Sequence, residues 1–350
     1  QTDIIRSWSV MKDIIGNTKG KSRFPPPYIT MQGKDIHSQT EMAQAFNKHF
    51  TTVGQNLANS IPFSHHSFKN FVTSTPGMFT IGEITATDIK NAFNSLKPHK
   101  SSGYDDFSID VIKAVADELI VPLSIIFSKS VEQGMFPNAM KIAKVIPIHK
   151  ADEQHDLNNY RPISILPALS KIFEKIIHTK LSMYLEKQQL LYIRQFGFRK
   201  NCSTEFGIVE LVESVSQAIE RRQYTVGVFL DIAKAFDTVN HKILLDKLQI
   251  YGINDKSIKW FSSYLCDRMQ YVQLMNANSG LLPVTCGVPQ GSILGPLLFL
   301  IYVNDLVNSV PCLQVVMFAD DTNVFYSHEN IYTLFARLNE QLKLISAWFQ

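Results

Sequence analysis

The chain has few cysteines, no long apolar run and little net charge. No pair of its cysteines has the spacing of a zinc site or of a disulfide framework, and reduced cysteines of an intracellular protein fit best. The longest apolar run, Ile293 to Val303, is interrupted by Gly295 and Pro296 and is too short to span a bilayer. It therefore predicts a buried helix. The four cysteines are Cys202, Cys266, Cys286 and Cys312.

A net charge of +3 does not by itself indicate nucleic-acid binding. The charge is unevenly distributed, however, because residues 141–200 hold 11 Lys and Arg against 5 Asp and Glu. A basic segment of this kind suits a phosphate backbone. We expect Arg199 and Lys200 to contact nucleic acid, whereas Lys171, Lys175 and Lys180 fit the solvated face of an amphipathic helix.

Two adjacent acids, Asp320 and Asp321, lie between short apolar runs at 314–319 and 322–327. This pattern predicts a tight hairpin with the acids at its turn. Adjacent carboxylates repel each other, so a fold tolerates them in water or beside a cation. Taken alone, such a pair is more often a solvated surface turn than a functional site.

A third acid, Asp231, ends the apolar segment 224–231, which has the composition of a central buried strand. If this strand lies beside the hairpin, three carboxylates meet at one sheet edge, where functional sites concentrate. Such a set suits Mg²⁺, and two such ions can assist phosphoryl transfer. The alternative is that Asp231 only caps the next helix, for which Asp237 and Thr238 are also candidate caps.

Three further segments add polar groups. Residues 287–292, Gly-Val-Pro-Gln-Gly-Ser, precede the apolar helix, and their glycines allow close approach to a ligand. Gln290 in this segment offers both a donor and an acceptor. Arg161 lies in Asn-Tyr-Arg-Pro-Ile-Ser at 159–164, and Lys150 ends a short predicted strand that begins at residue 143.

In this order, the segments resemble the reverse transcriptase domain of non-LTR (LINE-type) retrotransposons. The resemblance covers about residues 80–350. A weaker match lies at 100–106, where Ser102 and Asp106 replace the usual Pro and Gly. The stronger motifs are Phe-Ala-Asp-Asp at 318–321, Phe-Leu-Asp followed by Ala-Phe-Asp at 229–237, Gly-Val-Pro-Gln-Gly-Ser at 287–292, and the fingers-type motifs at 159–164 and 195–200.

The resemblance implies an α+β right-hand polymerase fold, with an antiparallel palm sheet backed by helices, fingers of helices and strands, and the thumb missing. The chain would then be a fragment. We expect an N-terminal extension or linker at 1–80, fingers and N-terminal palm at 81–222, and palm with the catalytic motifs at 223–350. The patterns also predict helices at 110–133, 204–221 and 330–349 and a hairpin at 270–286.

The resemblance also implies the metal site. Asp231, Asp320 and the Ile232 carbonyl would hold two Mg²⁺ ions, for which Mn²⁺ is a substitute. Asp321 belongs to the same catalytic set and would act as a supporting charge rather than as a ligand.

The nucleotide contacts follow from the same resemblance. Arg161 would grip the triphosphate, because a guanidinium makes bidentate contacts with phosphate oxygens. Lys150 would be a second contact, with Lys144 as its competitor. Phe236 would exclude a ribose 2′-hydroxyl by filling its volume, or pack between strand and helix, and the two roles are compatible.

Gln290 would contact the template or the nascent base pair. Gly287 and Gly291 would permit that approach to nucleic acid, or else form a helix-entry turn.

The implied activity is RNA-directed DNA polymerisation, in which a primer 3′-hydroxyl attacks the α-phosphate of a dNTP. The implied partners are an RNA template, a DNA primer and dNTP, with no membrane. An upstream endonuclease domain and a nuclear location are expected for the full-length protein. Two alternatives remain: an inactive reverse-transcriptase-like fold that binds nucleic acid, opposed by the intact acids, and an RNA-dependent RNA polymerase, opposed by Phe236.

Overall fold

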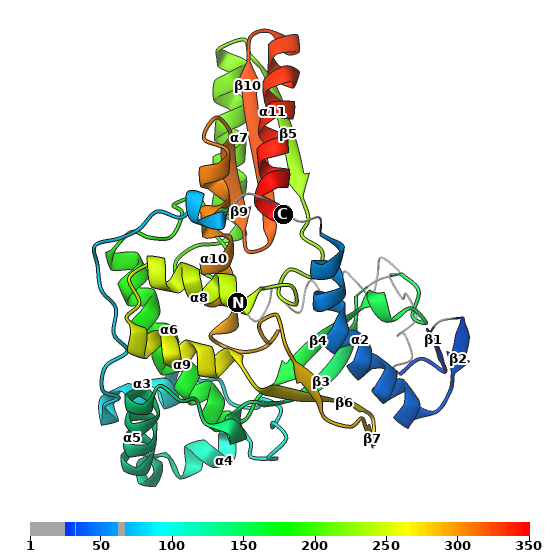
Figure 1. Ribbon diagram of the computed structural model, residues 1–350, viewed down its shortest axis with the longest axis vertical. Helices are drawn as coiled ribbons and strands as arrows, with labels where there is room; N and C mark the ends of the chain where they lie inside the picture. The colour runs from blue at the N-terminus through cyan, green and yellow to red at the C-terminus, as the bar shows by residue number, and fades with distance from the viewer. Residues whose placement is uncertain (1–24, 32, 62–66, 151) are drawn as a thin grey trace, which may run out of the picture.

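The structure is a computed structural model that describes residues 25–31, 33–61, 67–150 and 152–350. Figure 1 shows an elongated molecule with a broad lower part and a narrower upper part. Helices and strands alternate along the chain, and the sheets are antiparallel or mixed. The predicted mixing of helices with antiparallel strands is thus present. The sequence also predicts a loop at the adjacent histidines His65 and His66, which lie outside the described residues.

The upper part contains a three-stranded antiparallel sheet in the order β5 (Tyr224–Leu230), β10 (Asp321–His328) and β9 (Gln314–Phe318). The predicted hairpin is confirmed, because β9 and β10 pair with only Ala319 and Asp320 between them. Strand β5 is also confirmed, but its expected central, buried place is wrong. Because β9 already occupies the other side of β10, β5 forms an edge of the sheet, and Phe229 is 70% exposed.

The lower part contains a five-stranded sheet with β3 (Ile142–His149) between β4 (Tyr160–Ile165) and β6 (Arg268–Leu274). Strands β3 and β6 run parallel, whereas β3 and β4 run antiparallel. The hairpin predicted at 270–286 is confirmed, since β7 (Ala277–Asn278) and β8 (Leu282–Val284) both pair with β6. Strands from both sides of residue 222 therefore build one sheet.

Helix α2 (Gln39–Ser60) lies beside this five-stranded sheet (Figure 1). Its apolar face, which includes Met42 and Phe46, is buried in one cluster with Val145 and Val272. Segment 1–80, expected to be an extension, thus contributes a helix to a core of the molecule. The small sheet of β1 (Ile29–Met31) and β2 (Lys34–Ile36) precedes α2.

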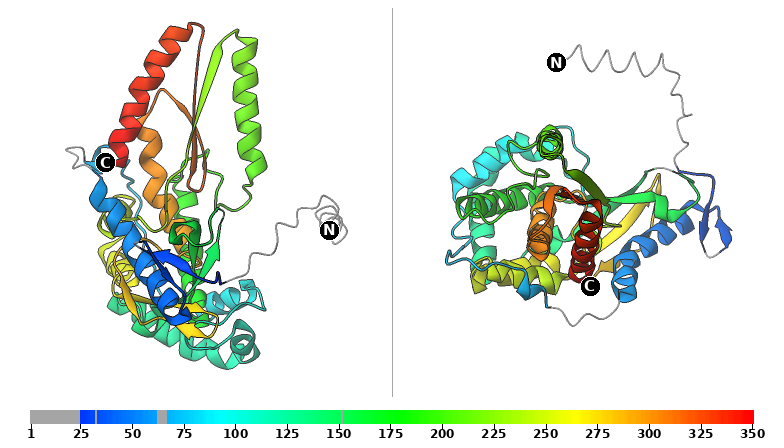
Figure 2. Two further views of the ribbon diagram at one scale, coloured as in Figure 1. Left: turned by 90° about the vertical axis from the view of Figure 1, so that its right-hand side faces the viewer. Right: turned by 90° about the horizontal axis from the view of Figure 1, so that it is seen from above.

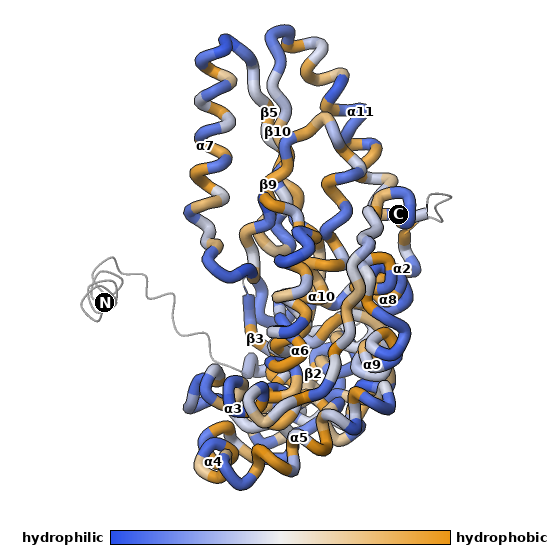
Figure 3. The backbone as a smooth tube through the Cα atoms, turned by 90° about the vertical axis from the view of Figure 1, so that its left-hand side faces the viewer, coloured by the Kyte–Doolittle hydropathy of each residue, from blue (hydrophilic) through white to orange (hydrophobic). Residues whose placement is uncertain are grey.

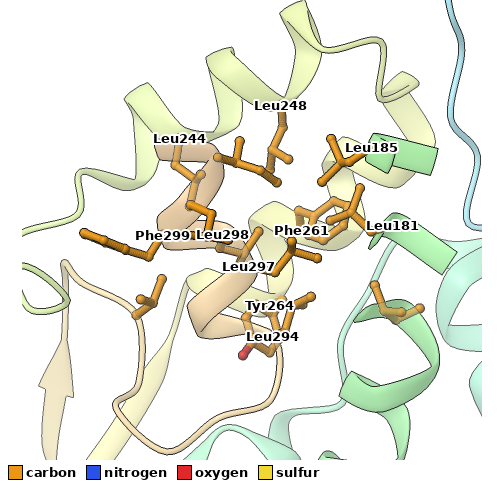
Figure 4. Close-up of a cluster of buried hydrophobic side chains, with 14 of the residues drawn as sticks. Leu181, Leu185, Leu244, Leu248, Phe261, Tyr264, Leu294, Leu297, Leu298 and Phe299 are labelled. Carbon is orange, nitrogen blue, oxygen red and sulfur yellow. The ribbon is translucent and has the colours of Figure 1, made fainter. Parts of the chain in front are cut away.

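The main core surrounds α10 (Gly295–Val303), of whose nine residues seven are buried. A helix that is apolar on all sides must be enclosed, which confirms the buried helix predicted from this run. Figure 4 shows side chains of α6 (Ala168–Lys187), α8 (His241–Ile250) and α9 (Asp255–Leu265) converging on those of α10. The remaining elements of the lower part are α3 (Ala86–Ser95), α4 (Ile109–Ala114), α5 (Ala116–Gln133), η1 (Phe68–Asn70), η2 (Asn138–Met140) and η3 (Leu157–Asn159).

The helix predicted at 110–133 is divided into α4 and α5 at Val115, whose ψ of 26° leaves the helical range. It ends, as predicted, at Gly134, which adopts a left-handed conformation with φ 66°.

Helices α7 (Thr204–Glu220) and α11 (Ile331–Phe349) lie on opposite faces of the three-stranded sheet (Figure 2). Both helices were predicted, but only α11 buries its apolar face, through residues such as Leu334 and Leu338. Apolar residues run along α7 (Figure 3), yet Ile208 and Ile219 are 59% and 66% exposed. Helix α7 therefore borders the sheet without sealing it.

All four cysteines are free. Within the described residues, none of the helices combines the length and apolar character that a membrane span requires.

A buried ion pair ties three elements of the core together. Lys247 of α8 donates to Asp305 of η4 (Asn304–Ser309), and both side chains are almost fully buried. Trp348 of α11 donates to the second Asp305 oxygen at 3.1 Å, and its ring lies 5.0 Å from the Lys247 ammonium. This network fixes α11 against α8, and so supports the face of the sheet that α11 covers.

Asp305→Leu should lower the free energy of unfolding by about 3–5 kcal/mol, because it leaves the Lys247 charge buried without its partner. Chemical denaturation measures this loss. The double variant Asp305→Leu/Lys247→Met, which removes both charges, should lose clearly less. Equal losses in the single and double variants would contradict this account of the network.

Candidate active site

The pairing of β5 with β10 brings the predicted acids to one sheet edge. Thr322 lies opposite Leu230, so Asp231 and Asp321, one residue further along, end their strands together. Asp320 occupies the turn before β10. Asp231 and Asp321 also border a groove of about 430 Å³ between α7 and the sheet. Two acids that are 90 residues apart in the sequence thus border one groove.

The pKa of the Asp320 carboxyl group is affected by the acids that lie near it. Its partial burial raises the pKa of its carboxyl group, and the negative charges of Asp321 and Asp231 raise the pKa further. The positive charge of Arg161 lowers it. A divalent cation bound between carboxylates offsets the repulsion between their negative charges, so this set of oxygen donors fits Mg²⁺.

Among the described residues, no three His, Cys, Asp or Glu side chains form a group that could hold a metal ion. The three acids expected to meet at this edge therefore do not by themselves form a metal-binding group of side chains, and water and substrate phosphates would have to complete the coordination of Mg²⁺.

The turn that carries Asp320 is held in a strained conformation. Ala319 has φ 58°, in the left-handed region that favours glycine. The Gln195 side chain clamps this residue, since its oxygen accepts from Ala319 N at 2.9 Å and its nitrogen donates to Ala319 O at 3.2 Å. Gln195 is only 2% exposed. The clamp therefore fixes the backbone immediately before Asp320.

The segment around Gln195 also pairs with β9. Phe196 N donates to Met317 O, and Met317 N donates to Arg194 O, both at 2.9 Å. We expected the motif at 195–200 to belong to the fingers, and its first residues brace the hairpin of the acids. The positioning role of Gln195 was missed, because no feature of the sequence connects it with Ala319, 124 residues away.

The loop 287–292 is joined closely to the rest of the site. Ser164 N of β4 donates to Gln290 O at 2.7 Å, and Val288 N donates to Phe236 O at 2.8 Å. A Cβ atom at Gly291, where φ is 118°, would lie 2.4 Å from Ser164 O. At Gly287, with φ 82°, it would lie 2.8 Å from the Asp237 Cα. Glycine is thus required at both positions, because a side chain there would clash with backbone atoms of neighbouring segments of the same chain.

Asp237 does not cap α8, contrary to one sequence expectation. Asn240 caps this helix by accepting from the backbone N–H groups of residues 242 and 243. Both carboxylate oxygens of Asp237 instead accept from Gln290 Nε2, at 3.1 and 3.0 Å. Burial raises the pKa of Asp237 to about 6, which the Gln290 hydrogen bond and the Lys234 charge partly oppose. Asp237, Thr238 and Asn240 are all suitable cap residues, so sequence alone does not choose among them.

The basic residues predicted to bind the triphosphate lie near the end of β3 and on β4. Arg161 is exposed on β4, and Lys150 is exposed immediately after β3. The competitor Lys144 is buried, with its ammonium 3.8 Å from Asp106. Lys234 Nζ donates to the carbonyl oxygens of residues 158 and 160, at 3.0 and 3.3 Å, which connects the loop after Asp231 to the strand that carries Arg161.

Phe236 is packed between two aromatic neighbours. Its ring stacks on Phe299 of α10, with 4.7 Å between centroids, and meets Phe198 edge-on at 5.9 Å. The core-packing role considered from the sequence is therefore present. Ile232 is half-buried and lines a cavity of about 720 Å³ between α2, α8 and α11.

The two residues expected to contact nucleic acid differ in their surroundings. Arg199 makes a two-point ion pair with Glu186, at 2.9 and 3.1 Å, and also donates to Tyr192 O. Lys200 is exposed. Arg199 therefore braces the chain from which Lys200 projects.

Glu174 holds the chain segment just before α10 in place, and the sequence analysis did not predict this role. This fully buried α6 carboxyl group accepts from the backbone N–H groups of Ile293 and Leu294, at 2.7 and 3.1 Å, just before α10. Burial raises the pKa of its carboxyl group. A carboxyl group at a helix N-terminus is favourable, so Glu174 anchors the loop 287–292 where it enters the helix. An acid within an amphipathic helix ordinarily indicates a solvated face.

Comparison with known proteins agrees with this geometry. The family described as "Reverse transcriptase (RNA-dependent DNA polymerase)" matches residues 148–350, more than half of the chain. The RNA-directed DNA polymerase from mobile element jockey of Drosophila melanogaster is 32% identical over 77% of the chain and 30% of its own length. The probable RNA-directed DNA polymerase from transposon BS of the same species is 32% identical over 95% of the chain and 38% of its own length.

The chain belongs to the reverse transcriptase family, as a relative of the LINE-type mobile-element enzymes. The resemblance inferred from its motifs is confirmed, and membership implies the polymerase palm fold and dependence on a divalent metal. The chain spans about a third of the length of the curated relatives it matches.

The clamp on Ala319 can be tested without a ligand. Gln195→Ala should lower the free energy of unfolding by about 2 kcal/mol, because backbone groups of Ala319 lose buried partners. It should also speed amide hydrogen exchange selectively in 317–321, which exchange mass spectrometry detects. Gln217→Ala, at an exposed glutamine of α7, is the matched control and should change neither quantity measurably. Uniform exchange in Gln195→Ala would argue against a local clamp.

Proposed function

We propose that this chain carries the RNA-directed DNA polymerase activity of a non-LTR retrotransposon. A nucleotidyl group of a dNTP would be transferred to the 3′-hydroxyl of a primer on an RNA template. The observation that most supports this is the pairing of β5 with β10, which brings Asp231 to the same sheet edge as Asp320 and Asp321, while Arg161 is near enough to lower the pKa of Asp320. Two acids and a guanidinium in mutual range are what a metal-dependent triphosphate site requires.

In this proposal Asp231, Asp320 and the Ile232 carbonyl hold the divalent ions, with Asp321 as the supporting charge. The ions, Mg²⁺ or Mn²⁺, would supply neutralisation of phosphate charge and a more acidic hydroxyl. The Gln195 clamp fixes the backbone of the turn that carries Asp320, so that this turn does not have to be ordered when substrate binds.

Arg161 binds the triphosphate in this proposal, because its guanidinium stays charged and pairs with two oxygens at once. Lys150 adds a second positive charge. Phe236 closes the sugar side of the site, where an aromatic ring leaves no volume for a 2′-hydroxyl. Its contacts with Phe299 and Phe198 hold the ring in place. Gln290 contacts the template or the nascent base pair, from a loop whose glycines 287 and 291 allow it to pack closely on Asp237 and β4. Lys200 contacts the nucleic-acid backbone.

Several wider expectations belong to the same proposal. Residues 81–222 would serve as fingers and N-terminal palm, and 223–350 as catalytic palm. An endonuclease domain and a nuclear location would belong to a longer protein, and the curated relatives are about three times as long as this chain. An inactive fold that only binds nucleic acid is not favoured, because Asp231, Asp320 and Arg161 are all present.

Primer extension with Mg²⁺ on an RNA template tests the proposed activity. Wild type should incorporate dNTP and discriminate against rNTP, whereas Asp320→Asn should reduce extension at least about a hundredfold, since it removes one metal ligand. Asp35→Asn, at an exposed acid of the small β1–β2 sheet, is the control and should retain wild-type activity. Full activity of Asp320→Asn would refute the metal assignment, and preference for rNTP would favour an RNA-dependent RNA polymerase.

A further inference from the structure

Asp237 has no chemical role in the proposed reaction. Its side chain contacts the loop 287–292 from the chain segment that begins at Asp231. Within the described residues, its carboxylate makes side-chain hydrogen bonds to Gln290 alone, and Gln290 Nε2 makes its hydrogen bonds to Asp237 alone. Each group therefore determines the orientation of the other.

The orientation has a chemical consequence. An ionised carboxylate is an acceptor with no proton to donate, so the amide nitrogen of Gln290, and not its oxygen, must face Asp237. The amide oxygen then points away from the carboxylate. Among the described residues no donor reaches that oxygen, although it is not sealed from solvent as the buried unsatisfied atoms of the structure are.

The rest of the loop is held independently, so that little besides the amide can rotate. Gln290 O accepts from Ser164 N at 2.7 Å, and Gly287 N donates to Val239 O at 2.9 Å. Cys286 Sγ donates to the backbone oxygen of Asp237 at 3.3 Å. With the backbone fixed on both sides, the carboxylate of Asp237 decides which end of the Gln290 amide is presented to a ligand.

We propose that Asp237 is a positioning residue that locks the Gln290 amide, so that the loop 287–292 presents a hydrogen-bond acceptor and recognises a donor on the bound nucleotide or template, namely a sugar hydroxyl. This inference rests on the proposed polymerase function and adds a selectivity to it. A freely rotating Gln side chain can bind a ligand through either a donor or an acceptor group. A locked side chain that presents only its oxygen binds a donor and rejects a ligand that offers only acceptors.

The test is a double-mutant cycle in primer extension, with kcat/KM for single-nucleotide incorporation as the readout. Asp237→Ala should lower kcat/KM about tenfold in the wild-type background, mainly through KM. In the Gln290→Ala background the same change should have less than about a twofold effect. A purely structural role for Asp237 predicts the same loss in both backgrounds, accompanied by a lower Tm, and would overturn the inference.

Asp237→Asn guards against misfolding of the alanine variant, because it keeps the shape of the side chain. The asparagine amide offers a donor as well as an acceptor, so it no longer enforces one orientation of Gln290. Its loss should be smaller than that of Asp237→Ala and should again vanish in the Gln290→Ala background. Asp35→Asn, the same substitution at the exposed acid of the small β1–β2 sheet, is the matched control and should remain within about twofold of wild type.

Two substrate changes identify the donor. If it is the 3′-hydroxyl of the incoming nucleotide, the effect of Asp237→Ala should disappear with a 2′,3′-dideoxynucleotide. If it is the 2′-hydroxyl of the template, the effect should disappear on a DNA template of the same sequence. Persistence of the full effect with both substrates would overturn recognition of a sugar hydroxyl. A wild type that extends no primer would overturn the proposed function and this inference with it, whereas independent effects in an active enzyme would overturn the inference alone.

Discussion

The antiparallel register between β5 and β10 is the constraint on which the site depends. It places Thr322 opposite Leu230, and so brings Asp231 and the Asp320–Asp321 pair to one edge. A slip of one residue would turn every side chain of β5 to the other face. The register is protected from the α11 side, where the buried Lys247–Asp305 pair and Trp348 fix the helix that covers the sheet.

Around this edge, buried polar side chains set the backbone of the functional segments. Gln195 clamps Ala319 before Asp320, Glu174 anchors the entry into α10, and Asp237 holds Gln290. Each of these groups acts on a segment far from it in the sequence. The residues proposed to meet substrate are therefore held in place by a second set of residues, whose side chains make hydrogen bonds within the protein.

The elements that depend on local sequence patterns were predicted correctly. The hairpin at the acids, the enclosed helix at 295–303 and the left-handed end at Gly134 all follow from periodicity, apolar runs or a glycine. The sequence predicted poorly what depends on distant partners. Strand β5 has a central strand's composition but lies at an edge, and Asp237 has a cap's position but binds Gln290, because tertiary pairing decides both. Gln195 and Glu174 carry no local signal of their roles.

The central claim is that Asp231 and Asp320, from different strands, hold the same divalent ions. Titration of Mn²⁺ followed by electron paramagnetic resonance, in the presence of primer, template and dNTP, tests it most directly. Asp231→Asn and Asp320→Asn should each weaken Mn²⁺ binding at least about tenfold, and Asp321→Asn less than about threefold. Unchanged binding in either of the first two variants, or a larger loss in Asp321→Asn, would contradict the account.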